Sequence, residues 1–242
     1  ISFVLVIISM YIQLRLEDTK AFKELEAAKS SQDNAKQEIK SSPILEALRR
    51  YPQRISLAAG AFLSIQVTFY ILVAFILAYG VQTTDLSRND LLAAVLIGSA
   101  IMVPLQFYFS HYSDKNGRKG IFMAGAFLTA LWSFFLFPLI DTGNFYLVIL
   151  AVTGGLAFLG MMYGPQAAFF AELFSTEVRY SGASLGYQIG AILGGSFAPT
   201  IATLLWTSYD IFWVSVYIAL ASAASLFSVY FLTETYKTDL NK

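Results

Sequence analysis

Long hydrophobic runs alternate with short polar breaks along most of this chain. The breaks read VQTTDLSRN, SDKNGRK, DTGN, ELFSTEVRY and TSYD. Several runs exceed the roughly 18 apolar residues needed to cross a bilayer. None alternates polar and apolar positions with the period of two that a membrane barrel strand requires, and lipid leaves unpaired backbone groups unsatisfied. The pattern predicts transmembrane helices at about 56–81, 89–111, 120–140, 145–171, 182–206 and 211–232.

The two ends of the chain have a different pattern. Residues 1–14 (ISFVLVIISMYIQL) are apolar but too short to span, and are expected to be the end of a helix that begins earlier. Residues 15–55 form a long polar segment with a helix-favouring stretch, FKELEAAKSSQDNAKQEIK. The predicted organisation is therefore a helix end, a polar loop at 15–55, a six-helix bundle at 56–232 and a tail at 233–242.

Composition agrees with a membrane protein. The chain is 57% hydrophobic and 13% charged, with a mean hydropathy of +0.61. Soluble domains carry about 25% charged residues. A soluble protein with so many apolar residues would still need a polar shell, which this composition does not supply.

The basic residues indicate the orientation of the spans. Of the 16 Lys and Arg, 15 fall in 15–55, in the breaks near 115 and 179, or in the tail, and Arg88 is the exception. Because basic residues stay on the cytoplasmic side, the loops 15–55, 112–119 and 172–181 and the C-terminus are predicted to be cytoplasmic.

Several classes of site are disfavoured. The chain has no cysteine and one histidine, His111, so no thiolate site or multi-histidine metal cluster is expected. Its net charge is zero, so no overall basic field attracts nucleic acid. We predict no cofactor, no metal and no nucleic-acid partner. His111 lies near the end of a span, where a solvated or capping role is favoured over proton transfer.

Six spans behind a long cytoplasmic loop suggest one half of a two-halved transporter. In such folds each half is a repeat, and the substrate binds near the midplane between the halves. The expected partners are a second six-helix half, the lipid bilayer, a small-molecule substrate and protons.

The break SDKNGRK carries a specific pattern. Asn116-Gly117 suits a tight turn, and Asp114 precedes Arg118 by four residues, so the two side chains can join the helix ends. A basic loop that merely obeys the topology is the alternative.

A second pattern extends over residues 161–188 (MMYGPQAAFFAELFSTEVRYSGASLGYQ). Glu172 ends one span and Arg179 begins the next, on the same side as Arg118. We expect Asp114, Arg118, Glu172 and Arg179 to form a cytoplasmic gating network whose pairs break when the transporter changes state. Gly164-Pro165 permits a bend within a span. Glycines every four residues from Gly182 allow a close helix approach.

Polar and aromatic residues within the spans are candidates for a substrate cavity. They recur at spacings of three or four, which place them on one helix face. The candidates are Gln66, Tyr70, Tyr163, Gln166, Tyr187 and Gln188. Thr68, Gln106 and Tyr108 are further polar positions. Hydrogen bonding between helices is the alternative for each, since buried glutamines need partners in any bundle.

Both patterns resemble known signatures. SDKNGRK resembles the loop motif Gly-x-x-x-Asp-Arg/Lys-x-Gly-Arg/Lys-Arg/Lys of the major facilitator superfamily, in its second copy, with Ser110 in place of the leading glycine. The longer run resembles Glu-Leu-Phe-Pro-Thr-x-Val-Arg-Tyr-Ser/Thr-Gly-Ala-Ser-Leu-Gly-Tyr-Gln of the metabolite:proton symporters, with Ser175 in place of proline. The resemblance covers essentially the whole chain. It implies an all-α membrane fold, the C-terminal six-helix bundle of a facilitator (helices 7–12), behind the end of helix 6 and the central cytoplasmic loop.

The resemblance also implies a function. It points to proton-coupled symport by alternating access, in a bacterial inner membrane, of a small polar metabolite such as a di- or tricarboxylate, a keto acid or a shikimate-like compound. Uptake of zwitterionic osmolytes such as proline or betaine, or a receptor or channel subunit, are the alternatives. An enzyme is not expected, because the spans lack clusters of His, Asp or Glu. For the same reason the proton-coupling acid is expected in the other half.

Overall fold

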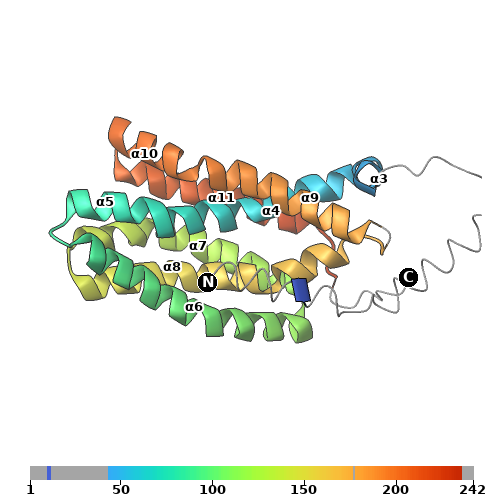
Figure 1. Cartoon of the computed structure of the whole chain (residues 1–242), viewed down its shortest axis with the longest axis horizontal. Helices are drawn as coiled ribbons and strands as arrows, with labels where there is room; N and C mark the ends of the chain where they lie inside the picture. The colour runs from blue at the N-terminus through green and yellow to red at the C-terminus, as the bar shows by residue number, and fades with distance from the viewer. Residues whose placement is uncertain (1–9, 12–42, 177, 236–242) are drawn as a thin grey trace, which may run out of the picture. The chain divides into compact units, whose positions relative to one another are not determined.

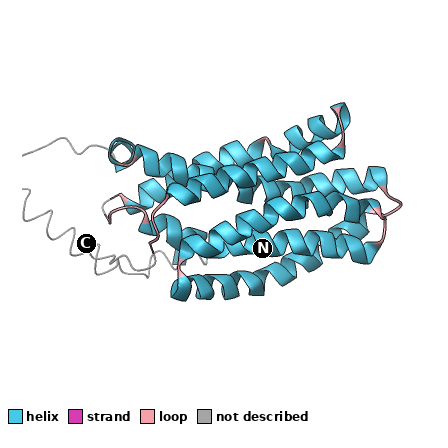
Figure 2. Cartoon of the chain, turned by 180° about the vertical axis from the view of Figure 1, so that it is seen from behind, coloured by secondary structure: helices cyan, strands magenta, loops and turns pink. Residues whose placement is uncertain are grey.

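The computed structural model describes residues 10–11, 43–176 and 178–235. Most of the expected helix end and polar loop therefore lies outside the described residues, as does the tail from residue 236. Residues 10 and 11 are helical and belong to the first of the two compact units into which the chain divides. Everything below concerns the second unit, within residues 42–240. Its described part consists of helices joined by short loops, without a strand (Figure 2).

Helices of membrane length account for most of this unit. Six of the described helices are long and apolar enough to cross a bilayer, as the hydrophobic pattern predicted. They are Pro52–Thr83, Arg88–Asn116, Arg118–Asp141, Phe145–Glu172, Arg179–Ser208 and Ile211–Phe231. The first three spans and the fifth extend beyond the predicted runs, because their first or last turns contain residues of the polar breaks, whereas the fourth and sixth match the prediction to within one residue. The all-helical six-span fold is thus confirmed.

Two of the six spans are interrupted by a short π-helical turn. In order, the elements are α3 (Pro43–Arg50), α4 (Pro52–Tyr70), η2 (Ile71–Phe75), α5 (Ile76–Thr83), α6 (Arg88–Asn116), α7 (Arg118–Asp141), α8 (Phe145–Glu172), α9 (Arg179–Ala191), η3 (Ile192–Ser196), α10 (Ala198–Ser208) and α11 (Ile211–Phe231). The first span is α4–η2–α5 and the fifth is α9–η3–α10. The turns η2 and η3 make a local change in the hydrogen-bond ladder without ending the helix.

The helices pack as a bundle whose neighbours are often distant in sequence. Helix α8 packs against α6 and α7, while α4 packs against α9 and α11, and α11 also packs against α7 (Figure 1). One end of the bundle carries the α5–α6, α7–α8 and α10–α11 connections. The other carries α3 and the α6–α7 and α8–α9 connections. We call these the Arg88 end and the Arg118 end.

The glycine stripe of the fifth span does allow a close approach. A Cβ added to Gly190 would lie 2.7 Å from the Ala59 carbonyl oxygen, and one added to Gly186 would lie 2.7 Å from the Ala58 Cβ. These distances are shorter than van der Waals contact, so α9 can pack this closely on α4 only with glycine there. Gly182 instead packs against the ring of Phe174.

Buried apolar side chains form two clusters. The cluster at the Arg88 end includes Phe75, Tyr79 and Phe137, and the rings of Phe75 and Tyr79 also contact Trp206. The cluster at the Arg118 end combines aliphatic side chains with the rings of Phe62, Phe122 and Phe170 from α4, α7 and α8. Polar residues on α6, α8 and α9 lie to the side of these cores, and they form the candidate site.

Candidate functional site

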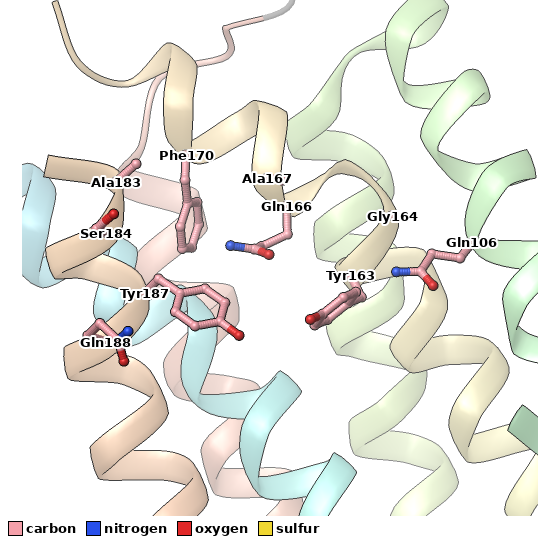
Figure 3. A pocket seen from close by; sticks show the side chains of 10 residues that line it. All are labelled: Gln106, Tyr163, Gly164, Gln166, Ala167, Phe170, Ala183, Ser184, Tyr187 and Gln188. Carbon is pink, nitrogen blue, oxygen red and sulfur yellow. The ribbon is translucent and has the colours of Figure 1, made fainter. Parts of the chain in front are cut away.

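A pocket of about 480 Å³ lies between α6, α8 and α9 (Figure 3). Its walls combine amide and hydroxyl side chains with aromatic rings. The lining residues are Gln106, Tyr163, Gly164, Gln166, Ala167, Phe170, Ala183, Ser184, Tyr187 and Gln188. Four of the six cavity candidates, Tyr163, Gln166, Tyr187 and Gln188, are therefore brought together.

Helix geometry directs these side chains into the same space. Tyr163 and Gln166 are three residues apart on α8 and share one face. Figure 3 shows them pointing toward the space that Tyr187 of α9 enters from the opposite side. The ring of Tyr187 also packs on Phe62 of α4, with centroids 4.3 Å apart, which fixes its position.

Gln166 is the most buried of the polar lining residues, at 5% exposure. A buried amide that keeps an acceptor and a donor available can bind a polar ligand without a charge. Among the described residues, neither an acid nor a base lines this pocket. The pocket is therefore suited to hydroxyl, carbonyl or carboxylate groups, with aromatic rings for the carbon skeleton.

The two remaining cavity candidates lie outside this pocket. Gln66 and Tyr70 are on α4, one turn apart, and contact the backbone of Gly194 and Gly195 in η3. Tyr70 is 39% exposed. They share a face of the first span as predicted, farther toward the Arg88 end than Phe62.

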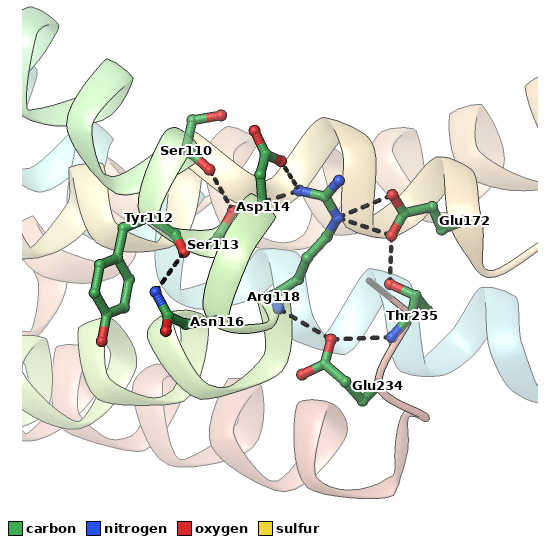
Figure 4. Close-up of polar contacts among 9 residues, drawn as sticks. All are labelled: Ser110, Tyr112, Ser113, Asp114, Asn116, Arg118, Glu172, Glu234 and Thr235. Atoms are coloured by element: carbon green, nitrogen blue, oxygen red, sulfur yellow. Dashed lines mark hydrogen bonds and ion pairs between the residues drawn. The ribbon is translucent and has the colours of Figure 1, made fainter. Parts of the chain in front are cut away.

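Charged residues gather at the Arg118 end (Figure 4). The Nε of Arg118 donates to both carboxylate oxygens of Glu172, at 2.9 and 2.7 Å. One of its terminal nitrogens donates to Asp114 at 2.7 Å. The side chains of Arg118 and Glu172 are only 10% and 11% exposed, whereas that of Asp114 is 52% exposed. Three of the four expected gating residues thus meet, and we call them the Arg118 cluster.

Gly117 makes this arrangement possible. It has φ 104°, a conformation that strains any residue with a side chain, so the α6–α7 turn needs glycine here. The turn reverses the chain within one residue and leaves Asp114, in the last turn of α6, beside Arg118, in the first turn of α7.

The relationship to known proteins follows from the sequence. A family model described as Major Facilitator Superfamily matches residues 1–185 of the chain. This chain belongs to the major facilitator superfamily. The motif resemblance in the α6–α7 and α8–α9 loops is therefore confirmed at the level of the family.

Curated relatives of this facilitator chain are named as transporters. The inner membrane metabolite transport protein YhjE of Escherichia coli (strain K12) is 31% identical over 242 residues, which are 97% of this chain and 52% of that protein. The shikimate transporter of the same strain is 31% identical, over 90% of this chain and 49% of its own length. A candidate proline/betaine transporter of Staphylococcus aureus (strain COL) is 25% identical over 82% of this chain.

These comparisons agree with a transporter and not with an enzyme. The chain spans about half the length of the curated relatives it matches. The relatives support a multi-pass protein of a bacterial inner membrane.

The fourth expected gating residue of this facilitator chain has a local contact. Arg179, at the first position of α9, donates to the hydroxyl of Thr176 at 3.2 Å. The described contacts of the Arg118 cluster do not include it. Arg179 and Glu172 nonetheless flank the same α8–α9 connection, as their positions in the sequence required.

Two residues of the tail join the Arg118 cluster, and the sequence analysis missed both. Glu234 accepts hydrogen bonds from the backbone N–H groups of Arg118 and Lys119, at 2.9 and 3.0 Å. The hydroxyl of Thr235 donates to Glu172 at 2.6 Å. The first N–H groups of a helix need acceptors, and Gly117 has no side chain to supply one. The uncapped start of α7 was the one feature of the sequence that could have indicated an acceptor from elsewhere in the chain.

Proposed function

We propose that this chain forms one half of a secondary active transporter that moves a small polar metabolite together with protons by alternating access. The observation that carries the proposal is the pocket of neutral polar and aromatic side chains on α6, α8 and α9. It lies within a bundle whose relatives are about twice as long. In this proposal the second half of the protein supplies the opposite wall of the cavity.

We favour an organic acid as the substrate. Amides and hydroxyls such as those of Gln166, Tyr163 and Ser184 bind carboxylate oxygens and ring hydroxyls by hydrogen bonds. A carboxylate, keto acid or shikimate-like compound presents both kinds of group. The shikimate transporter among the relatives is a precedent for such a substrate.

Proton coupling is proposed to depend on an acid in the second half. The lining of the described pocket contains glutamine, serine and tyrosine as its polar side chains. An acid whose protonation changes between the two states is needed to couple a proton to substrate movement. We therefore assign substrate binding through neutral hydrogen-bonding groups to this pocket, and the coupling proton to the second half.

The Arg118 cluster is proposed to act as the cytoplasmic gate of this half. The proposal takes the loops 112–119 and 172–181 to be cytoplasmic, as the distribution of Lys and Arg indicates. In the structure, the cluster ties the α6–α7 turn to the end of α8 and to the tail. Opening on this side would require at least one of these contacts to break.

A zwitterionic osmolyte is the second candidate substrate. Three rings, those of Tyr163, Phe170 and Tyr187, line the pocket, and aromatic faces attract quaternary ammonium groups. The candidate proline/betaine transporter among the relatives agrees with this alternative.

Uptake into membrane vesicles tests these proposals. The full-length protein is assayed with radiolabelled shikimate, succinate and glycine betaine under an imposed proton gradient, with and without a protonophore. Accumulation of shikimate or succinate that the protonophore abolishes is the expected result. Accumulation of glycine betaine alone would favour the osmolyte alternative, and accumulation that ignores the proton gradient would overturn symport.

A further inference from the structure

A stripe of exposed and half-buried residues runs along the first span, beyond the pocket described above. Its residues recur every three or four positions, which keeps them on one helix face through the π-helical turn η2. In order they are Gln66, Tyr70, Val73, Ala74, Leu77, Ala78, Val81 and Gln82. The stripe begins near the glycines of η3 and ends at the Arg88 end of the bundle.

The far part of this stripe forms a second pocket of about 550 Å³. Its wall consists of small and branched apolar side chains of η2 and α5, closed at one end by two polar residues. The lining residues are Val73, Ala74, Leu77, Ala78, Val81, Gln82 and Arg88. An apolar wall that ends in an amide and a guanidinium suits a small organic molecule with an anionic group.

Arg88 is the one basic residue at this end among the described residues. Within 43–176 and 178–235, its guanidinium makes neither a hydrogen bond nor an ion pair. An unpaired guanidinium keeps all of its donors available for a planar, two-oxygen acceptor such as a carboxylate.

Four acids lie at this end of the described chain, Asp85, Asp90, Asp141 and Asp210, and none of them forms a described ion pair with Arg88. Three of the four accept hydrogen bonds from other groups. Asp90 accepts from the hydroxyl and the backbone N–H of Ser87, at 2.7 and 2.9 Å, in a capping box at the start of α6. Asp141 accepts from the hydroxyl of Tyr79 at 2.5 Å. Asp210 accepts from the backbone N–H of Phe212 and caps α11.

Local packing holds Arg88 beside the pocket. A Cβ added to Gly80 would lie 2.8 Å from Leu91, so α5 and α6 are in tight contact one turn from Arg88. The Ser87–Asp90 capping box fixes the backbone on which Arg88 stands. These two constraints fix the backbone of Arg88 beside the pocket that its side chain helps to line.

We propose that Arg88 and Gln82 form a reception site for the carboxylate of the substrate, at the opposite end of the bundle from the Arg118 cluster. The apolar wall of η2 and α5 takes the carbon skeleton, and the stripe through Tyr70 and Gln66 leads toward the pocket on α8 and α9. This inference rests on the proposed transport of an organic acid. It adds a second, charge-selective site to the neutral one.

A phospholipid headgroup presents a similar anionic chemistry to an arginine at the membrane surface. The stripe favours the substrate, because its polar residues Gln66, Tyr70 and Gln82 would lie unfavourably against acyl chains. The experiment distinguishes the two sources.

Kinetics of uptake by the full-length protein give the first test. Arg88→Gln is expected to raise the KM for succinate about three- to tenfold, the loss of one charge-assisted hydrogen bond, with kcat nearly unchanged. Arg88→Lys should keep most of the affinity. A matched control places the charge one residue along the helix: Arg88→Gln with Asn89→Arg restores the net charge but should not restore the KM.

Cysteine labelling gives the second test, and it does not depend on transport. This chain has no cysteine, so Val81→Cys, with any cysteine elsewhere replaced, provides one thiol in the pocket. Succinate is expected to slow its reaction with an impermeant maleimide, and Arg88→Gln should raise the succinate concentration needed for half-protection about three- to tenfold. Thr207→Cys, exposed on α10 near the same end, should react equally with and without succinate.

The outcomes separate this inference from the proposed function. Succinate uptake with an unchanged KM in Arg88→Gln and no protection at Val81→Cys would overturn the reception site alone. The absence of uptake or protection with every carboxylate would overturn the organic-acid function and the reception site together. Labelling that depends on phosphatidylglycerol in the vesicles, and not on succinate, would assign the site to lipid.

Discussion

Arg118 and Glu172, 54 residues apart in the sequence, meet through a two-oxygen contact in which the Arg118 Nε donates to both carboxylate oxygens. Both side chains are about nine-tenths buried. The desolvation cost of two such charges is offset only while both are present. Removal of Glu172 leaves the buried Arg118 with the half-exposed Asp114 as its remaining ion-pair partner among the described residues.

Replacement of Glu172 should therefore be strongly destabilising. Glu172→Gln is expected to lower the free energy of unfolding by about 3 kcal/mol, because Arg118 stays buried beside a neutral amide. Unfolding of the purified full-length protein in detergent measures this. Asp114→Asn is the matched control: its side chain is half exposed, so a loss of about 1 kcal/mol or less is expected. Equal losses in the two variants would contradict the importance of burial.

The tail should stabilise the start of α7. Glu234→Ala removes the acceptor of the Arg118 and Lys119 N–H groups and should cost about 1 kcal/mol, with faster amide hydrogen exchange in the first turn of α7. Thr233→Ala, one residue earlier and exposed, should leave that exchange unchanged. Unaltered exchange in Glu234→Ala would mean that water caps the helix equally well.

The contrast between Glu172 and Glu234 shows what the sequence could predict. Glu172 ends a hydrophobic run on the same side as Arg118, so topology alone brought the two near each other. Glu234 follows the last span, and its role depends on how the chain turns after Leu232. That turn is set by contacts such as the Lys119 Nζ with the Leu232 carbonyl oxygen at 3.0 Å, which no periodicity encodes.

The first and fifth spans were also only partly predictable from the sequence. Hydrophobic length predicted both spans, but not the π-helical turns η2 and η3 within them. The two turns lie in spans that pack closely, where Gly195 would place a Cβ 2.7 Å from the ring of Tyr70. Helix register there is set by tertiary packing rather than by local propensity. For the same reason Gln66 and Tyr70 were correctly placed on one face, but their distance from the α8–α9 pocket was not foreseen.

Gln166 should contribute directly to substrate affinity. Gln166→Ala is expected to raise the KM for the transported metabolite about tenfold, because a buried amide that bonds a ligand is lost. Uptake kinetics of the full-length protein measure this, and Gln53→Ala, at an exposed glutamine near the start of α4, is the control. An unchanged KM in Gln166→Ala would show that this residue does not bind the substrate. If the KM rises while the melting temperature of Gln166→Ala stays that of the unmodified protein, the effect is on binding and not on folding.

Gly164 should be required for the packing of α8 on α6. The structure shows a close contact at Gly164: a Cβ there would lie 2.7 Å from the Gln106 carbonyl oxygen and 3.2 Å from the Ser110 backbone nitrogen. The bend predicted at Gly164-Pro165 stays a prediction. Backbone atoms cannot move aside as a side chain can, so Gly164→Ala must separate the helices and should cost about 2 kcal/mol of the free energy of unfolding.

Gly120 on α7 is the matched control, since a Cβ there meets nothing within 4 Å. Gly120→Ala should therefore be neutral or should stabilise the protein by up to about 1 kcal/mol, because alanine favours a helix. Thermal unfolding of the two variants compares the same chemical change at two sites. Because Gly164 also lines the pocket beside Gln166, Gly164→Ala should weaken substrate affinity as well, whereas Gly120→Ala should not.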